Sequence, residues 1–123
     1  MAVAHARLRY DKINVVVTPP GFQAIKNFSV NADSVVRLEI TLAAKQLDGA
    51  HRAAFKRTGL FFRDGAGPVQ VQGTTWLSDQ TVKSASPLDI KYSLGPADVS
   101  LSVRNSGSIA TRWVGYVDRT EVH

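Results

Sequence analysis

The sequence contains no cysteine, which excludes disulfides and thiolate metal sites. Its three histidines, His5, His51 and His123, lack the HxH and HExxH spacings of a zinc site. No apolar run approaches the roughly 18 residues that a membrane-spanning helix needs, and residues 1–10 lack the apolar middle of a signal peptide. We therefore expect no bound metal, no membrane contact and no secretion through a signal peptide.

The motifs of common catalytic and nucleotide-binding sites are also absent. The chain has no GxSxG elbow, no GxGxxG and no GxxxxGK(S/T) loop. Two carboxylates could still meet across strands as a glycosidase-like pair, which the sequence alone does not test. The carboxylates in predicted turns or on outward strand positions are Asp64, Asp79, Asp89, Asp98, Asp118 and Glu121. We expect no enzymatic activity, no catalytic residue and no cofactor.

The charge of the chain is moderate. It has 15 basic and 10 acidic residues, a net charge of +5, and the basic residues are spread over the whole length. This excess favours acidic partners, but a mildly cationic, solvated surface accounts for it more simply. With 123 residues, of which 44% are hydrophobic, the chain is long enough to form one domain around its own core.

Alternating apolar residues predict strands along most of the chain. In residues 36–42, Val, Leu and Ile alternate with Arg, Glu and Thr, which is the period of a half-buried strand. A helix over residues 38–47 ranks second, because Leu, Ala, Lys and Gln are good helix formers. Further strands are expected at residues 13–17, 28–30, 53–63, 69–77, 88–94, 98–104 and 109–122.

These strands predict an all-β fold, a single antiparallel β-sandwich of about seven to eight strands, with jelly-roll connections as one option. Residues 64–68 (DGAGP) are the strongest turn signal, and the polar residues 78–87 predict a connection between sheets. Residues 1–12 are expected to form an N-terminal arm or an edge strand, and residues 13–123 the sandwich domain.

The C-terminal residues carry the clearest pattern. Residues 98–104 (DVSLSVR) alternate strictly, and residues 105–108 (NSGS) tolerate the positive φ angles of a tight turn. Residues 109–122 then return as a second strand, so the sequence predicts a C-terminal antiparallel hairpin. Trp113 on this hairpin is expected to be buried in the core.

Two aromatic patterns have both a functional and a structural explanation. Residues 51–63 (HRAAFKRTGLFFR) interleave cations with phenylalanines, as nucleic-acid-binding sheets do. A strand with core phenylalanines and a charged edge explains the same pattern, and we expect no nucleic-acid partner. Trp76 is suited to a sugar-stacking platform, but tryptophan in a small sandwich is more often core or interface.

Three segments, taken in succession along the chain, form one ordered pattern: AHRAAFKRTGLFFRDGAGPVQVQGTT, LDIKYSLGPADVSLSVRNSG and ATRWVGYVDRTEV. A strand ends in a turn, a polar connection and a valine-rich strand follow, and the last strand reads T-x-W-x-x-x-V-x-x-T-E-V. Its matching residues are Thr111, Trp113, Val117, Thr120, Glu121 and Val122. This order resembles the C-terminal β-rich unit of small structural proteins of tailed bacteriophages. Arg119 departs from the pattern, which has an apolar residue there.

The resemblance implies a non-enzymatic structural protein located in the virion. The first hypothesis is a capsid decoration (cement) protein that binds the major capsid protein or other virion proteins and self-associates as a homo-oligomer, for example a trimer. The alternative is a tail or spike module that binds a host surface glycan through Trp76, Tyr92 or Tyr116. The sequence shows no fibre shaft or long coiled coil, which favours the first. Candidate partner-contact residues are Arg7, Arg9, Lys12, Phe61, Phe62 and Trp76.

Overall fold

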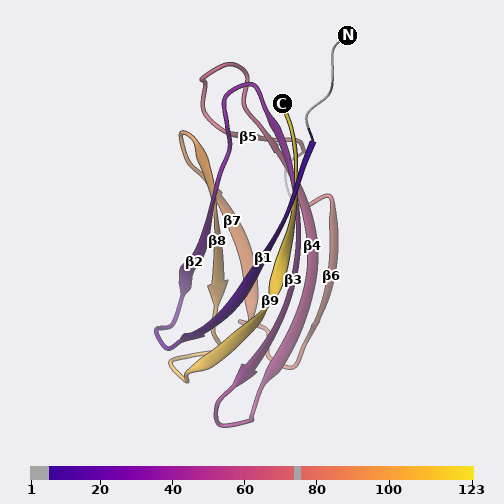
Figure 1. Ribbon diagram of the computed structural model, residues 1–123. Coiled ribbons are helices and arrows are strands. Elements are labelled where there is room, and N and C mark those ends of the chain that lie inside the picture. Colours follow the sequence, from indigo (N-terminus) through magenta and orange to yellow (C-terminus); the bar gives the residue numbers. More distant parts are fainter. Residues whose placement is uncertain (1–5, 74–75) are drawn as a thin grey trace.

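The computed structural model describes residues 6–73 and 76–123, with the side chains of all of these except residues 6–9. Within the described residues the chain forms nine strands and no helix, so no helix there is long and apolar enough to cross a membrane. The strands pair in antiparallel fashion in two sheets (Figure 1). This confirms the predicted all-β sandwich. His5 lies outside the described residues.

The larger sheet, here called the long sheet, contains six of the described strands in the order β1-β9-β3-β4-β5, with β6 also paired to β4. The smaller sheet has the order β2-β8-β7. The long sheet consists of β1 (Ala6–Val17), β3 (Val35–Gln46), β4 (Arg52–Phe62), β5 (Gln70–Val71), β6 (Ser78–Lys83) and β9 (Thr111–Val122). The short sheet consists of β2 (Phe22–Ser29), β7 (Asp89–Leu94) and β8 (Asp98–Arg104).

Strands β1, β3 and β9 are 12 residues long and pair in unbroken register over nearly their whole lengths. Strand β9 lies between β1 and β3, so the first and last described strands are neighbours (Figure 1). Residues 6–12 and 13–17 belong to the same edge strand, β1. The helix interpretation of residues 38–47 is wrong, because β3 continues to Gln46.

The core fills the space between the two sheets. Every second residue of β3 points inward and is at most 2% exposed from Val36 through Leu42, and β8 presents Val99, Leu101 and Val103 from the other side. Trp113 is fully buried, as predicted, and its ring stacks on Phe55 with centroids 5.9 Å apart. Burying one large apolar side chain stabilises a fold by about 1.5–3 kcal/mol.

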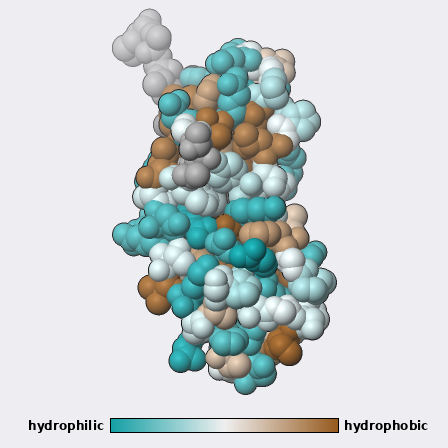
Figure 2. Space-filling model, turned by 180° about the vertical axis from the view of Figure 1, so that it is seen from behind, coloured by the Kyte–Doolittle hydropathy of each residue, from teal (hydrophilic) through white to brown (hydrophobic). Residues whose placement is uncertain are grey.

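Polar side chains cover most of the lower part of the surface seen from behind (Figure 2). Apolar residues show there singly, and the larger apolar patches lie toward the upper part of this view. Isolated exposed apolar residues are normal for a folded domain. On this side, the lower part of the molecule therefore has no broad apolar area.

The predicted C-terminal hairpin is wrong. Its first strand, β8, lies in the short sheet, whereas β9 lies in the long sheet, so the two do not pair. Asn105 fixes the crossing: its Nδ2 donates to the carbonyl oxygen of Val17 at 2.6 Å, and its Oδ1 accepts from Trp113 Nε1 at 3.0 Å. Both bonds satisfy buried polar groups, which are costly when unpaired. Alternation predicts that a strand exists, but not which strand it pairs with.

Residues 69–83 also differ from the expectation. Residues 69–77 were predicted as one strand, but within the described residues of this stretch only β5, Gln70–Val71, is extended and paired. Strand β6 lies instead in the predicted connection, where it pairs with β4 from Ala53 to Thr58. Because β6 is at the sheet edge and largely exposed, its residues are mostly polar and do not alternate.

Glu121 was predicted to face outward, but it points inward and is 2% exposed. Its carboxylate pairs with the guanidinium of Arg119, which is also buried and donates to the carbonyl oxygen of Ser29. His123 Nε2 lies 3.4 Å from Glu121 Oε2. Two charged residues can occupy inward positions here because they neutralise each other and one of them bonds to the backbone at the end of β2.

Candidate functional site

The outer face of the long sheet points away from the short sheet and the core. The even-numbered residues of β3 and the odd-numbered residues of β4 point into the core. The odd-numbered residues of β3 and the even-numbered residues of β4 therefore point outward. Neighbouring strands pair in continuous register, so outward side chains align in rows that run across the strands.

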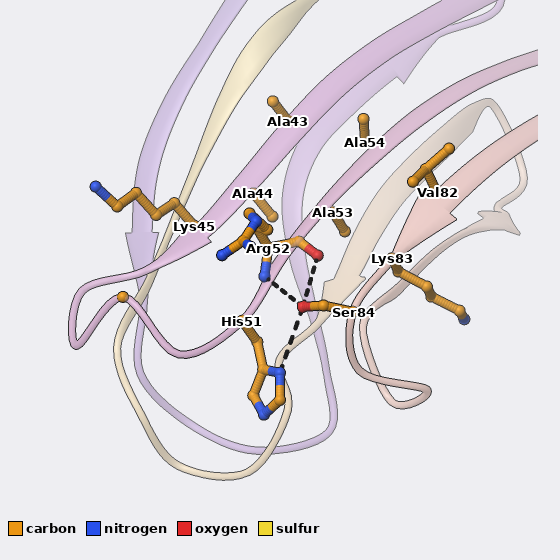
Figure 3. Close-up of a pocket in the computed structure, with 11 residues that line it drawn as sticks. Ala43, Ala44, Lys45, His51, Arg52, Ala53, Ala54, Val82, Lys83 and Ser84 are labelled. Atoms are coloured by element: carbon orange, nitrogen blue, oxygen red, sulfur yellow. Dashed lines mark hydrogen bonds between the residues drawn. The ribbon is translucent and has the colours of Figure 1, made fainter.

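One of these rows, here called the apolar row, contains Val114, Ala43, Ala54 and Val82. Each is the direct cross-strand partner of the next, from β9 through β3 and β4 to β6. The two valines are 43% and 76% exposed, and the small alanines between them leave a shallow groove of about 540 Å³ across β3, β4 and β6 (Figure 3). A second groove of about 350 Å³ lies between β3 and β9 and is lined by Ala43 and Val114.

The next row, here called the cationic row, contains Arg112, Lys45 and Arg52. Lys45 is the direct partner of both arginines, so three like charges lie opposite each other on adjacent strands. Strands are about 4.8 Å apart, and like charges at this spacing destabilise a sheet. No carboxylate in the described part of the chain forms an ion pair with any of the three.

The row on the other side of the apolar row mixes polar, aromatic and charged residues. Tyr116 stacks on Tyr10 with ring centroids 4.8 Å apart, and Tyr10 is 56% exposed. Lys56 Nζ lies 3.3 Å from Glu39 Oε1. The hydrogen bond from Lys56 is the main reason that the pKa of Glu39 lies below its ordinary value. Lys12 is exposed opposite Tyr116, so cations flank the apolar row on both sides.

Ser84 fixes the end of the groove at the β3–β4 hairpin. Its Oγ accepts from the backbone N–H of Arg52 at 2.9 Å, donates to the Arg52 carbonyl oxygen at 3.2 Å, and lies 3.3 Å from His51 Nδ1 (Figure 3). A catalytic Ser–His pair needs a free hydroxyl and a group that orients the imidazole. Here the Ser84 hydroxyl bonds both the N–H and the carbonyl oxygen of Arg52, so it is not free. No carboxylate among the described residues bonds His51. The contact therefore anchors Arg52.

Asp79 and Asp89 meet at a buried guanidinium. Arg57 Nε lies 2.9 Å from Asp79 Oδ1, and its Nη2 lies 2.8 Å from Asp89 Oδ1. Burial raises the pKa of Asp79, but hydrogen bonds from Thr81 and Arg57 outweigh it and lower the pKa overall. A glycosidase general acid needs a raised pKa. The described residues also contain no cluster of histidine and carboxylate side chains suited to a metal ion.

The structure separates the candidate contact residues. Phe61 is fully buried, and Trp76 is half-buried and lies edge-on to Tyr92 at 4.8 Å. Gly59 leaves the space for these rings, because a Cβ there would lie 2.7 Å from Phe61 Cε2 and 3.4 Å from Trp76 Cε3. Phe62 is half-buried on the outer face.

Of the basic candidates, Lys12 lies on the outer face, next to the apolar row. Arg7 and Arg9 lie in β1, and their side chains are outside the described part of the structure. The phenylalanines and cations that are interleaved in residues 51–63 do not form one surface. Phe55 and Phe61 point into the core, whereas Lys56 points outward.

The cationic row was missed by sequence reasoning, although a local signal exists. In three strands a cation and a small apolar residue are two positions apart, which places both on one face: Lys45 with Ala43, Arg52 with Ala54, and Arg112 with Val114. Their alignment into rows depends on the register of β9, β3 and β4, which single strands do not reveal.

No known protein family and no curated protein matches the sequence. The solved structures that are similar to this chain include two phage tailspike proteins. One is the tailspike protein gp49 of Acinetobacter baumannii bacteriophage Fri1, a capsular polysaccharide depolymerase, with a TM-score of 0.51 and 16% identity over 94% of this chain and 17% of that chain. The other is the tailspike protein of Acinetobacter baumannii phage AM24, with a TM-score of 0.46 and 12% identity over 94% and 26%. This chain shares its fold with a part of the Fri1 tailspike.

Proposed function

We propose that this chain is a non-enzymatic structural module of a bacteriophage tail, and that the outer face of its long sheet contacts a host-surface glycan. The observation that carries the proposal is the similarity to the Fri1 tailspike, which extends over 94% of this chain at a TM-score of 0.51. That protein is a capsular polysaccharide depolymerase, but the chain spans only 17% of its length. The sequence resemblance to tailed-phage structural proteins supports the same virion assignment independently.

The ends of the sandwich support a module within a larger tail assembly. Ala6 and Val122 are direct partners in the β1–β9 pair, so the chain enters and leaves the sandwich at the same end. A unit of this kind can join neighbouring domains at one end and project its far end, where the β3–β4 hairpin lies (Figure 1). The capsid-decoration hypothesis stays a prediction, and no feature of the outer face favours it over the tail.

The geometry of the polar residues supports a non-enzymatic role. Asp79 and Asp89 both neutralise Arg57, and Ser84 bridges the backbone of Arg52. Each of these side chains already makes a structural ion pair or hydrogen bond. That interaction would have to break before the side chain could take part in acid–base or nucleophilic chemistry.

Immunogold labelling of intact virions tests the assignment. An antibody raised against the chain is applied to virions purified from a lysate in which the chain is detected by mass spectrometry. Gold particles at the tail are expected. Gold over the head would support capsid decoration in place of the tail module, and unlabelled virions would reject both hypotheses.

A further inference from the structure

The cationic row is an unusual feature of a sheet that otherwise follows ordinary rules. Lys45 lies directly between Arg112 and Arg52, and each like-charge neighbour lowers the stability of the sheet. Elsewhere on the same face Lys56 and Arg37 both pair with Glu39. The cationic row therefore concentrates positive charge where the fold gains nothing from it, which indicates an anionic partner.

The neighbouring rows define the shape of that partner. The apolar row gives a shallow groove that crosses the strands, with small alanines at its centre. The pyranose rings of a glycan present flat C–H faces that pack on such a surface. The half-buried Tyr116 lies beside it on β9, stacks on the exposed Tyr10 of β1, and extends this surface. The groove therefore suits an extended polymer with both apolar faces and negative charges.

The direction of the groove argues against a peptide strand. An added peptide strand bonds to the free backbone edge of a sheet and runs parallel to its strands. The apolar row crosses β9, β3, β4 and β6, and β9, β3 and β4 all have both edges paired in this region. A second copy of this chain is also disfavoured, because two cationic faces repel each other.

We propose that the groove binds an acidic polysaccharide, with carboxylate groups on Arg112, Lys45 and Arg52 and sugar rings on the apolar row. This proposal rests on the proposed function and specifies the chemical class of the glycan. Guanidinium and ammonium groups bind carboxylates through charge-assisted hydrogen bonds, which are the strong ones in proteins. Binding is expected to weaken as salt is added, because exposed charges are screened.

Affinity electrophoresis of the whole chain through gels containing polygalacturonate, a carboxylate-bearing polysaccharide, tests the proposal. Gels containing neutral dextran serve as the reference. We expect retardation by polygalacturonate and none by dextran. The Lys45→Gln and Arg52→Gln variants should each lose about tenfold in affinity, the effect of removing one charge-assisted contact.

Lys91→Gln is the matched control for Lys45→Gln. Lys91 is exposed in the short sheet, where its Nζ lies 4.3 Å from the centroid of the Phe22 ring, and its removal changes the net charge by the same amount. This variant should bind as the wild type does. Ala54→Leu fills the groove without changing the charge and should also weaken binding, and a native circular dichroism spectrum verifies that each variant is folded.

Several results would overturn the proposal. These are equal retardation by dextran, equal losses for Lys45→Gln and Lys91→Gln, unchanged binding of Ala54→Leu, or tighter binding to poly-L-aspartate or to an oligonucleotide than to polygalacturonate. The outcome is independent of the virion location. Polygalacturonate binding combined with gold over the head would reject the tail assignment alone, and tail labelling without binding would reject the ligand alone.

Discussion

Asn105 and Trp113 connect the two sheets at the point where the chain crosses between them. The indole N–H of Trp113 and the carbonyl oxygen of Val17 are both buried. Asn105 Oδ1 accepts a hydrogen bond from the indole N–H, and Asn105 Nδ2 donates one to the Val17 carbonyl oxygen. Leu, Ile or Val at position 105 would fill the space but leave both groups unpaired, and each unpaired buried group costs about 1–3 kcal/mol. A single amide therefore ties the end of β8 to β1 and β9 of the other sheet.

Trp113→Ala is expected to lower the free energy of unfolding by about 3–5 kcal/mol, because it leaves a large cavity against Phe55. Trp113→Phe keeps an aromatic ring but removes the N–H donor to Asn105, so its loss should be smaller. Urea unfolding followed by circular dichroism measures both. A loss below about 1 kcal/mol for Trp113→Ala would contradict the buried position of the ring.

Lys45→Gln is expected to stabilise the fold, although Lys45 is exposed. The change relieves repulsion with Arg112 and Arg52 on the neighbouring strands, and cross-strand pair effects are about 0.2–1 kcal/mol. Thermal unfolding at low salt measures the gain, which should shrink in high salt. Lys91 has no cationic partner on the neighbouring strand, so Lys91→Gln should show no such gain in stability. A decrease in stability for Lys45→Gln would contradict the repulsion argument.

Strand β4 connects both sheets through one side chain. Arg57 points inward from β4 and bonds Asp79 of β6, Asp89 of β7 and the carbonyl oxygen of Ile90. Its side chain is 7% exposed, so the charge is stable in the interior only while these acceptors are in place. Strand β6 has few core residues of its own, and this ion pair is one of the contacts that hold it against β4.

The pKa of Asp79 predicts acid sensitivity at this junction. The pKa of Asp79 is lower in the folded chain than its ordinary value of 3.8, so the carboxylate stabilises the fold at pH values above 3.8. This contribution to stability is lost as the pH falls through the lower pKa of the folded chain. Asp79→Asn should lower the stability at neutral pH and make it less dependent on pH below 3.8. Urea unfolding at pH 3 and pH 7 compares the two proteins. An unchanged pH dependence would exclude this ion pair as its source.

The sequence predicts those elements in which burial produces alternation. Strand β3 is recognisable because its even positions are in the core, and Trp113 because its size demands burial. Strand β6 is not recognisable, because an exposed edge strand needs no apolar pattern. The crossing at Asn105 depends on three-dimensional hydrogen bonds, and the alignment of Lys45 with two arginines depends on register. Local sequence specifies neither.

At the scale of the whole molecule, β1 forms one edge of the long sheet, and its residues 6–12 include three cations, Arg7, Arg9 and Lys12, of the kind that discourage pairing with other chains. Residues 6–12 of β1 pair with residues 116–122 of β9, which would otherwise have a free backbone edge. A free edge in a long strand is a template for pairing with other chains. Strand β1 is therefore expected to contribute both to stability and to the solubility of the sandwich.

A chain that begins at Ile13 should unfold at lower urea concentration than the full chain and should associate in solution. The reason is that residues 116–122 of β9 lose one of their two partner strands and keep only β3. Light scattering after size-exclusion chromatography measures the association, with the full chain as the reference. Equal stability and equal mass for the two proteins would show that residues 6–12 contribute little to the sheet.

The position of β9 has a consequence for the way the protein folds. Because β9 lies between β1 and β3, the long sheet joins the two ends of the sequence, and only the β3–β4 side of it can form from contacts that are close in sequence. Such long-range pairing slows folding, typically to milliseconds or seconds for small β domains. During synthesis on the ribosome, β1 and β3 emerge before β9, and the strand that pairs with both of them is incomplete until residue 122 has emerged. The nascent sandwich is thus most exposed to misassembly while β1 and β3 have emerged and β9 has not.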